Sequence, residues 1–205
     1  MDVATIAGVI VCAYLLGSFP AGYLTARLWG VDVLSFGSGR TGGTNVLRTA
    51  GPIAALVTGT IDVGKGALAV WLAGQITGQP AAEVLAGVAV ILGHNHSIFL
   101  GFRGGAGVGT SLGALSAIYM PAAIGLLVLL VVIIAVTRYA SIGSLTVVTV
   151  MPLVLLVLAL NGVLSMTYLA YGVLAWAIIV NQHRPNIRRL MLGTERRLGL
   201  GNDKS

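Results

Sequence analysis

The chain has 205 residues, of which 57% are apolar and only 9% are charged. Soluble domains carry about 25% charged residues, so this composition excludes an ordinary soluble globular protein. The apolar residues fall into runs of about twenty, which is the length that a helix needs to cross a bilayer. The formal charge of +6 lies mostly between those runs and at the C-terminus. We therefore predict an all-α, polytopic integral membrane protein.

We expect seven transmembrane helices in one membrane domain, residues 1–205. Their approximate bounds are 3–25, 52–74, 82–101, 106–120, 121–137, 143–160 and 163–182. The fourth and fifth are the least regular, because 106–137 is long for one crossing and short for two, and Pro121 fits a turn between them. If seven spans alternate, every Lys and Arg outside the spans falls on one side, which the positive-inside rule assigns to the cytoplasm. The N-terminus is then outside, and the basic tail 183–205 is cytoplasmic.

A glycine-rich motif, G-S-G-R-T-G-G-T-N-V-L-R, follows the first span at 37–48. It combines glycines with hydroxyl, amide and guanidinium side chains. Exposed backbone amides and fixed positive charge suit a phosphate-bearing ligand, and their place beside a membrane favours chemistry on an anionic lipid. The candidate site residues here are Ser38, Gly39, Arg40, Gly42, Thr44, Asn45 and Arg48.

The second span contains G-T-I-D-V-G-K-G, residues 59–66, which is similar to a nucleotide-binding P-loop. It is not one, because Gly66 stands where a Ser or Thr would hold magnesium and because the segment is an apolar span. Asp62 and Lys65 lie three residues apart on one helical face. Ionisable groups inside a membrane usually mark a functional interior, and an ion pair with a purely architectural role stays equally open. We predict that this pair is structural or lines the site.

A second glycine-rich motif, G-H-N-H-S-I-F-L-G-F-R-G-G-A-G-V-G-T, occupies 93–110. Its glycines allow backbone amides to face a ligand, and the N-terminus of the next helix adds partial positive charge. Helix packing through small residues is the alternative. Basic and hydroxyl side chains at the same membrane face favour an anion site. No metal site is predicted, because no carboxylate or cysteine accompanies the two histidines. The candidates are His94, Ser97, Arg103, Gly104, Gly105, Gly107 and Thr110.

Further candidates lie nearer the C-terminus. Arg138 and Ser141 follow the fifth span, where a lone Arg is often only an interfacial anchor. The last span ends in N-Q-H-R-P-N-I-R-R-L, 181–190, and His183, Arg184 and Asn186 follow it directly. We assign the other arginines of the tail to anionic head groups; they are Arg188, Arg189, Arg196 and Arg197.

Three of these motifs together resemble the bacterial membrane acyl-phosphate:glycerol-3-phosphate acyltransferases. The matching patterns are G-S-G-x-x-G-x-T-N-V-x-R, G-H-x-x-S-x-F-L-G-F-[KR]-G-G-x-G-V-x-T and H-R-x-N-I-x-R-L. The resemblance covers nearly the whole chain. It implies seven spans in the bacterial plasma (inner) membrane, an external N-terminus and a cytoplasmic active site.

The resemblance also implies a reaction, the transfer of a fatty acyl group from acyl phosphate to the 1-hydroxyl of glycerol 3-phosphate. Lysophosphatidic acid and phosphate are the products. Ser38, Arg48, Ser141 and His183 are then predicted to be catalytic, and the other candidates, apart from Asp62 and Lys65, to bind substrate. The proton acceptor is open between His183, His94 and a substrate phosphate. No cofactor, nucleic acid or obligate protein partner is implied; membrane lipids surround the protein.

Three positions depart from the family's usual pattern. Arg40 replaces an Asn, Ala106 replaces the Lys of G-G-K-G, and Pro185 replaces a Glu. We hypothesise that Arg40 restores the cation missing at Ala106. The departures at Arg40 and Ala106 keep open a diverged paralogue that acylates another phosphorylated acceptor. A separate alternative is an organic-anion transporter. A transporter would need polar groups through the bilayer midplane and a path to the outer face.

Overall fold

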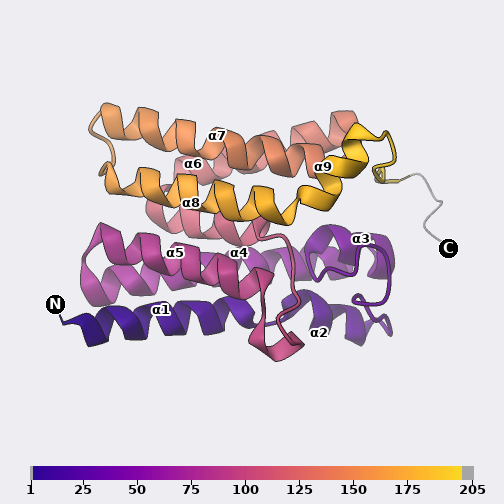
Figure 1. Ribbon diagram of the computed structural model, residues 1–205, viewed down its shortest axis with the longest axis horizontal. Helices are drawn as coiled ribbons and strands as arrows, with labels where there is room; N and C mark the ends of the chain where they lie inside the picture. The colour runs from indigo at the N-terminus through magenta and orange to yellow at the C-terminus, as the bar shows by residue number, and fades with distance from the viewer. Residues whose placement is uncertain (1, 200–205) are drawn as a thin grey trace.

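A bundle of long, roughly parallel or antiparallel helices makes up this protein (Figure 1), in a computed structural model that describes residues 2–199. The helices are α1 (Val3–Ser18), α2 (Ala21–Leu28), α3 (Gly43–Ala50), α4 (Pro52–Thr77), α5 (Pro80–Asn95), the 3-10 helix η1 (Ile98–Leu100), α6 (Val108–Thr137), α7 (Ala140–Leu160), α8 (Thr167–Gln182) and α9 (Arg184–Met191). No strand forms within the described range, so the predicted all-α fold is confirmed. Lys204, in the predicted basic tail, lies outside the described residues.

Among residues 2–199, four helical segments are long and apolar enough to cross a bilayer: Val3–Leu28, α4, α6 and α7. Helix α5 is apolar but has only 16 residues, and α8 also has 16. Helix length alone therefore does not give the predicted count of seven.

The first predicted span, 3–25, is interrupted. Helix α1 ends at Ser18 and α2 begins after Pro20, because proline has no N–H to continue the hydrogen-bond ladder. The break leaves the carbonyl of Phe19 free of the helix ladder, and it accepts a hydrogen bond from Lys65 Nζ at 3.3 Å. Lys65, which the sequence singled out as a charged residue inside a span, thus contacts the break between α1 and α2.

Helix α6 folds back on itself. Its dihedral angles leave the helical region at Tyr119 (φ −157°, ψ 96°), two residues before Pro121, so the predicted turn lies close to that proline. A straight helix of 30 residues would measure about 45 Å, yet Val108 and Ile134, from its two ends, line the same pocket. The helix therefore consists of two limbs that run in opposite directions.

Glycines bring the first limb of α6 against α4. A Cβ at Gly66 would lie 2.1 Å from the carbonyl oxygen of Thr110, and one at Gly113 would lie 2.0 Å from that of Val63. Any side chain at these two glycines would separate the helices. This contact places the start of α6 beside the buried charged residues of α4.

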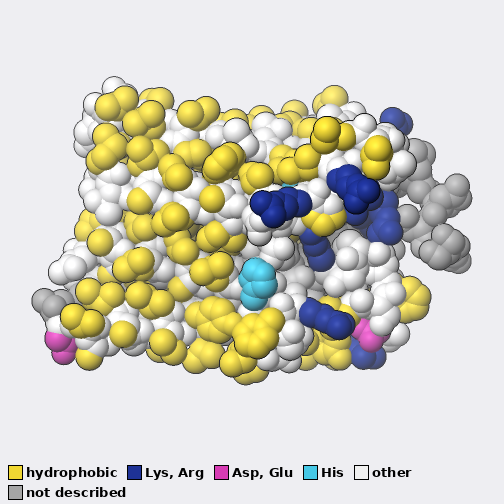
Figure 2. Space-filling view, in the orientation of Figure 1, with side chains coloured by type: hydrophobic (Ala, Val, Ile, Leu, Met, Phe, Trp, Pro, Cys, Tyr) yellow, Lys and Arg dark blue, Asp and Glu magenta, His cyan; other side chains and the backbone are white. Residues whose placement is uncertain are grey.

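The two ends of the bundle differ in chemistry. Apolar side chains are spread over the visible face, while arginines gather toward the end that carries α3 and α9 (Figure 2). Large apolar residues such as Leu56, Trp71 and Val136 are more than half exposed, as expected for side chains that face lipid. The polar end is where the predicted site residues converge.

Candidate active site

A cavity of about 210 Å³ opens at the polar end of the bundle, between α3, the two limbs of α6, the start of α7 and the α8–α9 junction. Twelve of the residues singled out from the sequence line it, from motifs far apart along the chain. They are Ser38, Arg40, Gly42, Thr44, Asn45, Arg48, Asp62, His94, Gly107, Ser141, His183 and Asn186. The structure therefore brings the predicted motifs into one pocket.

The remaining candidates lie outside the lining, and their roles stay predictions. Arg103, Arg138 and Arg184 are exposed on the surface. The other candidates are buried or half-buried and do not line the cavity: Gly39, Lys65, Ser97, Gly104, Gly105 and Thr110.

Asn45 organises the first glycine-rich loop. Its Nδ2 group donates to the carbonyls of Val33, Phe36 and Arg40 at 2.9 to 3.1 Å, and its Oδ1 accepts from the backbone N–H of Ser38 at 2.9 Å. Because the amide is buried and committed to the backbone, Asn45 shapes the loop. Ser38 and Arg40 are held at the pocket as a result.

The second glycine-rich loop is built on His94. The Gly105 N–H donates to the His94 carbonyl at 3.0 Å, and a Cβ at Gly105 would lie 2.1 Å from His94 Nε2. Only glycine fits against the ring there. The two loops also meet, since the Thr41 N–H donates to the Gly104 carbonyl at 3.3 Å. The N-terminus of α6 follows and faces the pocket through Val108, so its partial positive charge favours anions there.

A buried charged network lies below this loop. Lys65 Nζ is 2.8 Å from Asp62 Oδ1 and 2.8 Å from His94 Nδ1, and the His94 Nδ1 to Asp62 Oδ1 distance is 3.3 Å. All three side chains are at most 6% exposed. The predicted Asp62–Lys65 pair is confirmed, and Asp62 and His94 also line the pocket.

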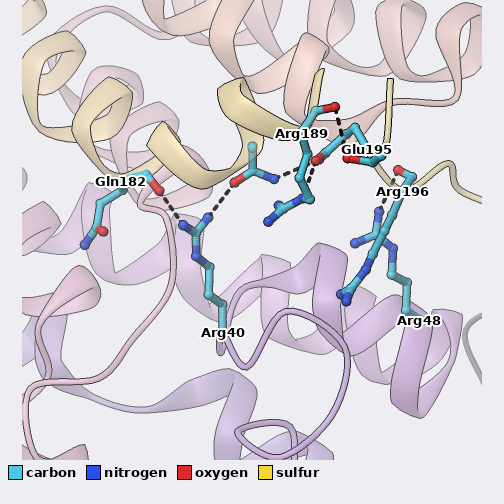
Figure 3. Close-up of polar contacts among 8 residues, drawn as sticks. Arg40, Arg48, Gln182, Arg189, Glu195 and Arg196 are labelled. Carbon is cyan, nitrogen blue, oxygen red and sulfur yellow. Dashed lines mark hydrogen bonds and ion pairs between the residues drawn. The ribbon is translucent and has the colours of Figure 1, made fainter. Parts of the chain in front are cut away.

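Arg40 crosses the pocket from the first loop to the α8–α9 junction (Figure 3). Its guanidinium donates to Asn186 Oδ1 at 3.1 Å and to the carbonyl of Gln182. Burial lowers the pKa of Arg40, and the nearby Arg189 lowers it further, although an arginine stays charged at neutral pH. Arg40 and Ala106 line the same cavity, as the replacement hypothesis requires.

The C-terminal segment supplies residues that sequence reasoning missed. Glu195 accepts hydrogen bonds from Arg189 Nε at 2.7 Å and Asn186 Nδ2 at 2.8 Å, and the Arg196 carbonyl accepts from Arg48 at 3.1 Å (Figure 3). Burial raises the pKa of Glu195, but the hydrogen bonds that its carboxylate accepts from Asn186 and Arg189 outweigh burial and bring the pKa below the usual 4.5.

Arg189 and Arg196 therefore line the pocket, contrary to the expectation that they only bind head groups. One sequence signal for Arg189 was available, since it follows Asn186 by three residues and shares its helical face. The position of Arg196 depends on the path of the chain after α9, which no local pattern reveals. Ser144 also lines the pocket, one helical turn after the predicted Ser141.

His183 sits at the α8–α9 junction with its ring fixed. Its Nδ1 lies 2.8 Å from the carbonyl oxygen of Ile179. Because a carbonyl oxygen only accepts, Nδ1 carries the proton and Nε2 is left as an acceptor. Burial lowers the pKa of His183 below 6.5, and the charge of Arg40 lowers it further. A neutral imidazole with a bare nitrogen is a competent general base at pH 7.

Comparison with known proteins identifies the family of this chain. Residues 7–193 match the family model described as glycerol-3-phosphate acyltransferase. The chain is 41% identical to glycerol-3-phosphate acyltransferase 3 of Dehalococcoides mccartyi strain 195 over 100% of both chains. It is 43% identical to glycerol-3-phosphate acyltransferase of Synechococcus sp. strain CC9902 over 91% of this chain and 92% of that one.

Two crystal structures of PlsY (YgiH), described as an integral membrane glycerol 3-phosphate acyltransferase, share the fold at 33% identity. The glycerol 3-phosphate form matches with a TM-score of 0.86 over 95% of this chain and 96% of that chain. The lysophosphatidic acid form matches with a TM-score of 0.84 over 95% of each. The chain therefore belongs to the glycerol-3-phosphate acyltransferase family, as its three motifs indicated, and it is an integral membrane enzyme of phospholipid biosynthesis.

Proposed function

We propose that this pocket transfers a fatty acyl group from acyl phosphate to the 1-hydroxyl of glycerol 3-phosphate. The observation that carries the proposal is the convergence of Arg40, Arg48 and Arg189 on one cavity of an otherwise apolar bundle. Several fixed cations in one small cavity suit a pair of phosphorylated reactants. The relatives named above, and the solved structure with glycerol 3-phosphate, support this choice of acceptor.

His183 is the proton acceptor that the geometry favours. Its Nε2 takes the proton of the glycerol hydroxyl while that oxygen bonds to the acyl carbon. The bond between the acyl carbon and the phosphate oxygen then breaks, phosphate leaves with the bonding electrons, and the proton returns from His183 to phosphate. Because phosphate is already a good leaving group, positioning and charge stabilisation account for most of the catalysis.

The other lining residues take matching roles. The arginines and the start of α6 hold phosphate oxygens, and the hydroxyls of Ser38 and Ser141 orient the reactants. Arg40 takes the place of the family's usual Lys at Ala106, because the hydrogen bond from Thr41 to Gly104 keeps the two loops together. Apolar lining residues from α6, such as Leu130 and Ile134, accept the start of the acyl chain.

We also propose seven crossings, with the N-terminus outside and the pocket facing the cytoplasm of a bacterial cell. The two limbs of α6 supply the fourth and fifth crossings if Tyr119 marks the turn. The concentration of arginines at the pocket end supports this orientation (Figure 2). The N-terminal end of α1 lies at the opposite end of the bundle (Figure 1).

The test is an assay of the purified protein with acyl phosphate and glycerol 3-phosphate, followed as phosphate release and lysophosphatidic acid. We expect equal amounts of the two products, and no comparable rate with acyl-CoA or with other phosphorylated polyols. A higher rate with another acceptor would identify a diverged paralogue. Uptake of glycerol 3-phosphate into proteoliposomes without any acylation would show that the protein is a transporter and not an acyltransferase.

A further inference from the structure

The buried network of Asp62, Lys65 and His94 determines which nitrogen of the His94 ring carries a proton. We propose that Lys65 is a positioning residue: it holds His94 in the tautomer with a proton on Nε2, so that His94 donates a hydrogen bond to a phosphate oxygen of a substrate. This inference rests on the proposed function for the identity of the ligand. It removes His94 from the candidates for general base.

Lys65 has as many N–H groups as acceptors around it. Its Nζ lies 2.8 Å from Asp62 Oδ1, 2.8 Å from His94 Nδ1 and 3.3 Å from the Phe19 carbonyl. An ammonium group has three donors and no acceptor capacity. A proton on His94 Nδ1 would therefore set two N–H groups against each other, so Nδ1 is the acceptor and Nε2 carries the proton.

Asp62 competes with Lys65 for the same ring nitrogen. Its Oδ1 lies 3.3 Å from His94 Nδ1, farther than Lys65 Nζ at 2.8 Å. With Lys65 removed, the carboxylate would be the remaining polar neighbour of Nδ1 in this network and would draw a proton there. Lys65 also neutralises Asp62, which lines the pocket and would otherwise repel an anion.

The Nε2 edge of the ring faces the second glycine-rich loop. A Cβ at Gly105 would lie 2.1 Å from Nε2. The Gly105 N–H also donates a hydrogen bond to the His94 carbonyl, which holds this loop against the ring. Within residues 2–199 no hydrogen bond involves His94 Nε2, although the residue lines the cavity. An oxygen of a bound phosphate is the acceptor that this N–H lacks.

The experiment is nitrogen-15 NMR of the solubilised full-length enzyme labelled at histidine. The chain has only 3 histidines, so the signals that disappear in His94→Gln identify this ring. In the wild type we expect Nδ1 to resonate as an unprotonated nitrogen and Nε2 as a protonated one. A protonated Nδ1 in the wild type would overturn the proposal, even if every Lys65 variant failed to fold.

Lys65→Met is the variant that tests causation. We expect its His94 Nδ1 to become protonated, and the KM for one phosphorylated substrate to rise about tenfold or more, as for a lost hydrogen bond to a charged group. The matched control is Lys65→Met combined with Asp62→Asn, in which the new amide donates to Nδ1 and restores both the tautomer and most of the lost affinity. An unchanged tautomer in Lys65→Met would refute the role of Lys65.

Binding is measured apart from catalysis. We expect added glycerol 3-phosphate or inorganic phosphate to shift the Nε2–H signal of His94 in the wild type. The absence of a shift with both probes would refute the donor role. A shift in an enzyme that shows no acyl transfer would leave this inference standing and reject the proposed reaction instead.

Discussion

The pocket contains two buried histidines that differ in one neighbour. At the α8–α9 junction, His183 Nδ1 faces the carbonyl of Ile179 at 2.8 Å; at the end of α5, His94 Nδ1 faces the ammonium of Lys65 at 2.8 Å. A carbonyl requires a donor and an ammonium requires an acceptor. The two rings therefore present opposite groups to the cavity, a bare nitrogen from His183 and an N–H from His94.

The largest effect is expected from His183→Gln. A glutamine amide fits the site but cannot take a proton, so kcat should fall by about 10²–10⁴-fold, the usual contribution of a general base. KM should change little. Initial rates of phosphate release, measured at saturating concentrations of both substrates, give the comparison with wild type.

An effect of His183→Gln on KM alone would contradict the assignment. The substrate's own phosphate, the third candidate for the base, would then take the proton. Circular dichroism and gel filtration of the variant ensure that the loss does not arise from unfolding.

The acid limb of the pH profile of kcat/KM gives a second test of His183 as the general base. A lowered pKa means that His183 stays neutral as the pH falls past 6.5 and becomes protonated only below that value. We expect kcat/KM to stay nearly flat from pH 8 to 6.5 and to fall about tenfold per pH unit well below the lowered pKa. The sign for stability is the same, because the unfolded chain binds this proton first and acid therefore favours unfolding. An acid limb of kcat/KM with its midpoint above pH 6.5 would contradict the prediction that His183 is buried as a neutral imidazole with a lowered pKa.

Arg40→Ala is expected to reduce kcat/KM by about tenfold to a hundredfold, the scale of charge-assisted hydrogen bonds. Because the charge of Arg40 lowers the pKa of His183, the variant should also move the acid limb to higher pH. Both readouts come from one set of rate measurements across pH.

The matched control is Arg27→Ala. The Arg27 side chain is 51% exposed and pairs with Asp32 at 3.0 Å, away from the lining of the cavity, so its loss should stay within about twofold. Equal mild effects of the two variants would reject the hypothesis that Arg40 replaces the family's missing lysine.

The fold was predictable to the extent that its signals are local. Lengths of apolar runs and the placement of Lys and Arg predicted helices and a polar end, and the turn near Pro121 lies at Tyr119. The sequence alone did not decide the break at Pro20, because a proline late in an apolar run fits a bend and the end of a helix equally well.

The site was predictable where motifs carry several polar residues together, as with Arg40, Arg48 and Asn186. Arg189 and Glu195 were missed for a physical reason: a basic tail beside a membrane binds lipid head groups in any fold. Only the return of the chain after α9 brings Glu195 against Asn186. The proton position on His94 depends on its contact with Lys65, 29 residues away in the sequence, and that on His183 depends on its contact with Ile179, four residues away. Neither contact can be read from a sequence motif.

The smallest effect is expected from His94→Gln, the same substitution that should be most damaging at His183. The glutamine side chain ends in an NH₂ group near the place of Nε2–H, so it still donates to a phosphate oxygen, and kcat/KM should remain within about threefold of wild type. His94→Leu removes the donor and should raise the KM for one phosphorylated substrate about tenfold. If glutamine were as harmful at His94 as at His183, both rings would act as bases and the contrast set by Lys65 and Ile179 would not hold.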